Sequence, residues 1–126
     1  MTESIICERS FELASRLLKL ADRIWDRGPS ARHVASQLMR CGTSVGANAE
    51  EAQEGQSRAD FIAKMNISRK EARETRFWLR LARKNEIVTE KESAWELSEA
   101  NQPLAMIRSA VLTAKSRLKQ SSKGGS

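Results

Sequence analysis

The stretch "MRCGTSVGANAEEAQEG", residues 39–55, decides how this chain folds, although it carries features that disfavour a helix. Its apolar residues keep the three- and four-residue spacing of a helix, yet Gly42 and Gly46 lie inside that pattern. Each glycine costs a helix about 1 kcal/mol relative to alanine. Three glutamates follow within residues 50–54, at the end where the helix dipole disfavours negative charge. A helix here therefore needs a packing gain that offsets these costs.

The spacing of the two glycines predicts that gain. Gly42 and Gly46 are four residues apart and share one helix face, which Ala35 and Ala49 extend. A strip of small residues lets another backbone approach closely. We predict that this helix and the next one along the chain pack closely at Gly42 and Gly46.

Helical periodicity in the rest of the chain predicts an all-α fold, an antiparallel up-down four-helix bundle in one domain of residues 1–119. The expected helices cover residues 8–27, 30–54, 58–84 and 90–118. Pro103 should kink or split the last helix, and residues 120–126 should form a disordered tail. In the first helix, the expected seam is Phe11, Ala14, Leu17, Leu18, Ala21, Ile24 and Trp25.

Two capping patterns support the later boundaries. Ser57 stands three residues before Asp60, and Thr89 stands three residues before Glu92. The second pair has the sequence of a capping box, in which each side chain binds the backbone N–H of the other residue.

The composition excludes several classes of protein. One histidine among 126 residues makes a metal cluster improbable, and no motif indicates a cofactor. Two cysteines are too few for a disulfide scaffold, so we expect a cytoplasmic protein in which Cys41 is a buried thiol. There is no signal-peptide pattern and no apolar run of membrane-spanning length.

Positive charge is concentrated in one segment. Residues 57–84 contain nine Lys and Arg against three acidic residues, a difference that equals the whole net charge of +6. Arginines recur there at steps of four, three, four and three, within about 80° of one another around a helix. We call this set, with one more arginine on the same face, the arginine stripe: Arg58, Arg69, Arg73, Arg76, Arg80 and Arg83. With Lys70 and Lys84 beside it, the stripe predicts contacts to nucleic-acid phosphates.

A second interpretation of the stripe needs no nucleic acid. Glu92, Glu96 and Glu99 form an acidic strip on the last predicted helix, level with Arg76–Arg83 if the two helices form a hairpin. Salt bridges within or between subunits could then consume the arginines, each exposed pair contributing about 0 to 1 kcal/mol. The protein would in that case be a structural or protein-binding bundle.

A polar strip also follows the glycine-bearing helix, with Arg40, Asn48 and Glu51 on it. Glu71 lies on the apolar side of the next helix, where a carboxylate needs a partner. Hairpin geometry places Arg40 within one turn of Glu71 and Glu74, so we expect a charge-assisted network that fixes register.

Two segments carry a resemblance to a known family. "RHVASQLMRCGTSVGANAEEAQ", residues 32–53, and "DFIAKMNISRKEARETRFWLRLA", residues 60–82, resemble the four helix bundle protein family. That family includes proteins encoded by intervening sequences in bacterial large-subunit ribosomal RNA genes. It is similar to the accessory variability determinant of diversity-generating retroelements.

The resemblance implies an up-down bundle that assembles as a homopentamer. For the retroelement relatives it implies binding of nucleic acid and of a reverse transcriptase. It also implies architectural roles at the family's signature positions, here Arg40, Gly42, Gly46, Asn48, Glu51, Glu71 and Glu74. Met39, Trp78 and Trp95 are expected to contribute contacts beyond the seams of one subunit.

One enzymatic alternative remains open. Arg27 and His33 resemble the arginine and histidine element of helical ribonucleases of the HEPN class. A histidine can act as a general base while an arginine stabilises phosphate. Together, the sequence favours a non-enzymatic, oligomeric adaptor that binds RNA or DNA through the arginine stripe.

Overall fold

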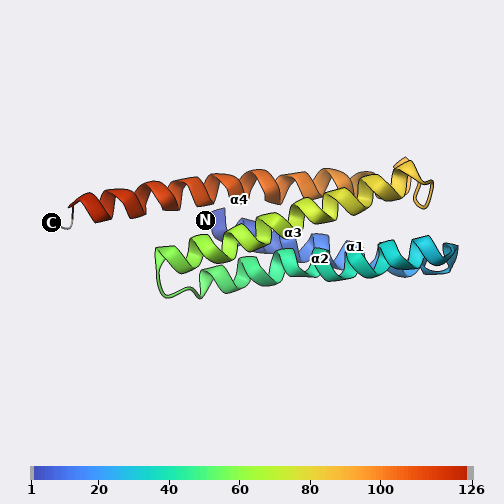
Figure 1. The fold of residues 1–126 in the computed structure, drawn as a ribbon, viewed down its shortest axis with the longest axis horizontal. Helices are drawn as coiled ribbons and strands as arrows, with labels where there is room; N and C mark the ends of the chain where they lie inside the picture. Colours follow the sequence, from blue (N-terminus) through green and yellow to red (C-terminus); the bar gives the residue numbers. More distant parts are fainter. Residues whose placement is uncertain (1, 125–126) are drawn as a thin grey trace.

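The computed structural model describes residues 2–124, and within them the chain is all-α with four long helices and no strand (Figure 1). The helices are α1 (Thr2–Ile24), α2 (Pro29–Gln53), α3 (Arg58–Lys84) and α4 (Glu90–Gly124), and a 3-10 turn, η1 (Trp25–Arg27), follows α1. No helix in the described part of the chain is long and apolar enough to cross a membrane. The predicted all-α class is therefore confirmed.

The helix starts follow from local chemistry. Gly28 has a φ of +119°, a conformation that favours glycine, and Pro29 then occupies the first turn of α2. The capping box at α4 is confirmed, because Thr89 N donates to Glu92 Oε1 at 2.9 Å and Glu92 N donates to Thr89 Oγ1 at 3.0 Å. At α3, Ser57 Oγ accepts from Asp60 N.

Helix α4 differs from the prediction in two ways. We predicted a kink or a split at Pro103, and the split does not occur, because Pro103 lies inside a helix that continues without a break (Figure 1). Proline removes one backbone hydrogen bond, but buried Ala100 and Ile107 hold the helix against the core on both sides of it. Residues 120–124, predicted to belong to a disordered tail, continue α4, whereas residues 125–126 of that tail lie outside the described part.

Helix α1 starts earlier than predicted, at Thr2, and the predicted seam is buried only in part, at Leu17, Ala21 and Ile24. Phe11 and Leu18, both assigned to the seam, are 69% and 41% exposed. The side chains that are fully buried instead include Leu13 and Leu20. Phe11, Leu18 and Trp25 recur every seven residues, so they form an exposed apolar stripe along α1 and the start of η1.

The glycine strip faces α1, which corrects the predicted contact with α3. A Cβ on Gly42 would lie 2.5 Å from Leu17 Cδ1, and one on Gly46 would lie 3.4 Å from the backbone of Ser10. Neighbouring positions of α2 contact α3, where Ser68 Oγ donates to the Val45 carbonyl at 2.6 Å. Helix α2 is flanked by two helices, and the glycines lie on the side of α1.

The core consists of two clusters along the length of the molecule. The first lies near η1 and the α3–α4 turn and includes Leu20, Ile24, Leu79 and Val88. The second lies near the α2–α3 turn and includes Ile6, Ala49, Met65 and Ile107. Helices α3 and α4 lie together near their connecting turn and diverge towards the start of α3, and α4 continues past the α2–α3 turn (Figure 1).

Candidate nucleic-acid interface

Helix α3 presents the arginine stripe on its surface. Arg58, Arg73, Arg76 and Arg80 are exposed and Arg69 is half-buried. In the part of the chain that the structure describes, none of these five guanidinium groups has an ion pair or a side-chain hydrogen bond. Lys70 and Lys84 are also exposed. Because arginine is always charged near neutral pH, this face of α3 carries uncompensated positive charge.

Arg83 differs from the other stripe residues. Its Nε donates to Ser93 Oγ at 2.8 Å, and one of its terminal nitrogens donates to the Glu90 carbonyl at 3.0 Å. The side chain thereby ties the end of α3 to the start of α4. Arg83 was predicted to contact nucleic acid, and the structure shows that it also links α3 to α4.

Two of the three acidic residues of the strip, Glu92 and Glu99, contact α1 and η1 rather than α3. Arg27 donates to both carboxylate oxygens of Glu92, with Arg23 3.9 Å away, and Arg9 pairs with Glu99 at 3.4 Å. The hydrogen bond from Arg27 lowers the pKa of Glu92 and raises that of Arg27 itself. Among the described residues of one chain, these acids form no ion pair with the arginines of α3, and pairing between subunits stays a prediction.

Three stripe residues converge on a hollow between α3 and α4. Arg76, Arg80 and Arg83 line it together with Leu97 and Asn101 of α4, and its volume is 420 Å³. No carboxylate is among the described residues that line it. An anion in this hollow would accept hydrogen bonds from three guanidinium groups, each about one turn of α3 from the next.

The structure brings together three members of the predicted polar network. Arg40 contacts Glu71 and Glu74, and Trp78 Nε1 donates to Glu74 Oε2 at 3.0 Å. The other two members lie apart from it. Asn48 bonds within its own helix to Ser44, and Glu51 pairs with Lys64 at 2.8 Å. The network therefore ties α2 to α3 at two separate levels.

The two residues of the ribonuclease alternative have different surroundings. His33 is exposed and packs edge-on against Trp78, with ring centroids 5.4 Å apart. Arg27 binds Glu92 and donates to the Ile87 carbonyl at 2.9 Å. A phosphate would have to compete with a carboxylate for this arginine.

Cys41 and the three residues expected to face other subunits are at least partly buried within the single chain. Cys41 is buried, which raises the pKa of its thiol, and it accepts a hydrogen bond from Thr75 Oγ1. Met39, Trp78 and Trp95, expected to face other subunits, are partly buried against the first core cluster. No cluster of side chains suited to a metal ion occurs among the residues described.

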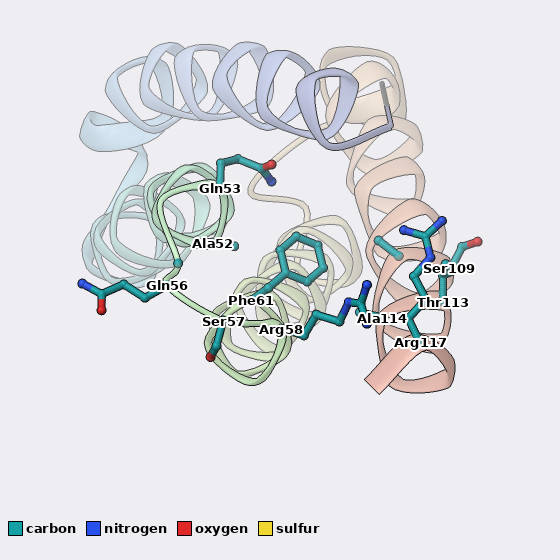
Figure 2. A pocket seen from close by; sticks show the side chains of 12 residues that line it. Ala52, Gln53, Gln56, Ser57, Arg58, Phe61, Ser109, Thr113, Ala114 and Arg117 are labelled. Atoms are coloured by element: carbon teal, nitrogen blue, oxygen red, sulfur yellow. The ribbon is translucent and has the colours of Figure 1, made fainter. Parts of the chain in front are cut away.

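A pocket at the α2–α3 end of the molecule was not predicted from the sequence. It has a volume of 620 Å³ and lies between the α2–α3 turn and α4 (Figure 2). We call it the end pocket. Phe61 of α3 points into the space between α2 and α4, and Arg58 reaches towards α4, which carries Arg117, Ser109 and Thr113 (Figure 2).

One signal in the sequence indicates the basic character of this region, although not the pocket itself. Residues 100–126 contain five Lys or Arg and no acidic residue. The whole-chain balance conceals this excess, because residues 1–56 and 85–99 are acidic overall. Because α4 is helical through this segment, Arg117 lies beside the start of α3.

Comparisons with known proteins agree with this architecture. A structure described as a protein with unknown function from the S23 ribosomal protein family of Bacteroides thetaiotaomicron VPI-5482 has a TM-score of 0.80 and 32% identity. The match covers 88% of this chain and 98% of that one. The comparison with curated proteins finds no match. The family model of the 23S rRNA-intervening sequence protein matches residues 2–109. The chain therefore belongs to the family of 23S rRNA-intervening sequence proteins.

Proposed function

We propose that this protein is a non-enzymatic adaptor that binds nucleic acid phosphates through the arginine stripe of α3. The observation that carries the proposal is the absence of any ion pair at Arg58, Arg69, Arg73, Arg76 and Arg80 in the described structure. These five residues fall within about 60° of one another around α3. Such a row supports contacts to successive phosphates, which are weakly sequence-specific and strongly salt-dependent.

The family supports RNA as the first ligand to test. Its description refers to intervening sequences of 23S rRNA. Proteins of a cell's interior meet abundant RNA, and the cysteine usage of this chain suits a cytoplasmic location. DNA presents the same phosphate chemistry and is the comparison ligand.

We also propose that the helices form an antiparallel up-down bundle that assembles as a homopentameric ring. Opposite directions of α2 and α3 are supported by the Glu51–Lys64 pair near their turn and the Arg40–Glu74 pair farther from it. Assembly is supported by the exposed stripe of Phe11, Leu18 and Trp25. The accessible surface of 7608 Å² also exceeds the value of about 6,700 Å² typical of a compact monomer of 14.1 kDa.

A protein-binding role is the second candidate function. Phe11 and Leu18 of the same stripe line a 360 Å³ groove, and its α2 wall includes Thr43, Gly46, Ala47 and Glu50. A protein partner, such as the reverse transcriptase of the retroelement relatives, could occupy this groove instead of another subunit. This role and phosphate binding use different faces, so they are not exclusive.

The stripe is tested by a filter-binding titration of RNA and of DNA with the wild type and the Arg73→Glu/Arg80→Glu variant. A matched control is Lys19→Glu/Arg32→Glu, which changes the net charge equally at exposed positions on α1 and α2. We expect the stripe variant to lose at least about tenfold in affinity at low salt, since it removes two of five phosphate contacts. We expect the control to lose much less.

Two results would contradict the proposal. The first is that the wild type binds neither RNA nor DNA at low salt. The second is that the folded stripe variant binds as tightly as the control. Circular dichroism of both variants shows whether the helices are intact, so that loss of binding is not mistaken for loss of fold.

A further inference from the structure

The end pocket is positively charged, and an anion bound there would neutralise it. Arg58 from α3 and Arg117 from α4 both line it, and neither has an ion pair or side-chain hydrogen bond in the described part of the chain. No Asp or Glu is among its described lining residues. Two guanidinium groups that share a pocket without a carboxylate repel each other unless an anion lies between them.

The pocket also has an aromatic floor. Phe61 is half-buried, packs against the second core cluster and points into the space between α2 and α4 (Figure 2). Aromatic side chains beside basic residues are the means by which proteins hold unpaired bases, because every base has a face that can stack. The volume of 620 Å³ falls within the range of about 300–1,000 Å³ typical of small-molecule sites.

Polar groups around the floor suit the edge of a base or a sugar. Ser109 and Thr113 of α4 supply hydroxyl groups, and Gln53 at the end of α2 supplies an amide. Both kinds of group can donate and accept hydrogen bonds. The site therefore combines an anion-binding wall, a stacking surface and hydrogen-bonding groups, which are the three parts of a nucleotide-binding pocket.

The opposite side of the α2–α3 turn has the reverse charge. A second hollow there is lined by Glu50, Glu51, Glu54 and Asp60, with Lys64 as its basic residue. Phosphates are repelled from that side and attracted to the side of Arg58. Arg58 belongs both to the arginine stripe and to the end pocket, so one strand can contact both.

We propose that the end pocket receives one unpaired nucleotide, with its phosphate between Arg58 and Arg117 and its base stacked on Phe61. This inference rests on the proposed function and adds a preference to it. A duplex offers phosphates to the stripe but keeps its bases paired, whereas a single strand can also fill the pocket. The protein therefore favours single-stranded over double-stranded nucleic acid.

The test compares a labelled single-stranded oligouridylate with a duplex RNA of the same length by fluorescence anisotropy. Phe61→Leu removes the stacking surface but keeps an apolar side chain against the core. We expect it to weaken single-strand binding by at least about fivefold and to change duplex binding by less than about twofold. Thr113→Leu, at an exposed lining position, should block the pocket with the same selectivity and without loss of a core contact.

A matched pair of basic residues separates the pocket from the general charge of α4. Arg117→Ala should weaken single-strand binding, whereas Lys115→Ala, exposed on the same helix but outside the lining, should leave it nearly unchanged. If the wild type binds neither ligand, the proposed function fails. If the wild type binds both ligands and Phe61→Leu and Thr113→Leu leave their ratio unchanged, only the pocket is overturned.

Discussion

At the scale of single residues, the two glycines of α2 explain how a helix with poor propensity is retained. Both face α1, and they differ in the space that surrounds them. A methyl group at Gly46 would make van der Waals contact with the Ser10 backbone, 3.4 Å away, whereas one at Gly42 would displace the buried Leu17 side chain. The packing gain that offsets helix propensity is therefore greatest at Gly42.

This difference predicts that substitution by alanine changes the stability of the fold differently at the two positions. Gly46→Ala should be neutral or stabilise the fold by up to about 1 kcal/mol through helix propensity. Gly42→Ala should be less stable than Gly46→Ala, because Leu17 must shift. Gly46→Leu should destabilise by more than about 1 kcal/mol, since its side chain meets the backbone of α1. Urea unfolding of the three variants measures these differences, and an unchanged midpoint for Gly46→Leu would count against close packing there.

Glu92 predicts a pH-dependent contribution to stability. Its pKa is lowered from the ordinary value of 4.5, chiefly by the hydrogen bond from Arg27. A carboxyl whose pKa is lower in the folded state stabilises the fold above its unfolded pKa, and this contribution is lost as the pH falls through the folded pKa. Glutamine keeps the capping box with Thr89 but removes the charge.

We therefore expect Glu92→Gln to be less stable than the wild type at neutral pH, by a few tenths to about 1 kcal/mol because Arg27 is partly exposed. The two proteins should converge in stability as the pH falls below the folded pKa of Glu92. Thermal unfolding across that range measures the difference. A gap that stays constant into strong acid would show that the charge of Glu92 does not contribute.

At the scale of elements, the sequence predicts the helices better than the faces that they bury. The periodicity and caps of α2 and α3 place these helices to within a residue or two of their bounds. In α1, Phe11 and Leu18 satisfy the helical spacing as well as Leu13 and Leu20 do, so periodicity alone could not select the buried set. The partner of the glycine strip was ambiguous for a related reason, because α2 has a neighbouring helix on each side.

Helix α4 shows a second limit of local patterns. Proline and the Ser- and Gly-rich end both predict interruption, yet the helix runs from Glu90 to Gly124. Tertiary contacts at Ala100 and Ile107 hold the segment around Pro103. The end pocket could not be predicted from local patterns, because it forms only where the packing of the helices places Arg117 of α4 near Arg58 of α3.

At the scale of the whole molecule, the exposed stripe on α1 predicts assembly. A ring of five chains of 14.1 kDa has a mass of about 70 kDa. Light scattering should show this mass for the wild type and a smaller one for Phe11→Ser/Leu18→Ser, which makes the apolar stripe polar. A monomer at micromolar concentration for the wild type would contradict the prediction.

A ring would also present several arginine stripes at once. Contacts that are modest for one stripe can then combine through avidity if the geometry allows one strand to reach two stripes. The electrostatic contribution of each stripe remains measurable, because every phosphate contact releases counterions and adds to the salt dependence of binding.

The salt dependence of duplex binding tests the central claim most directly. With five unpaired arginines on each stripe, the log–log slope of the binding constant against salt should be about −4.5 for one engaged stripe. It should fall to about three fifths of the wild-type value, about −2.7, for Arg73→Glu/Arg80→Glu. Lys19→Glu/Arg32→Glu should keep the wild-type slope. Equal slopes for the wild type and the stripe variant would show that the arginine stripe does not contact phosphates.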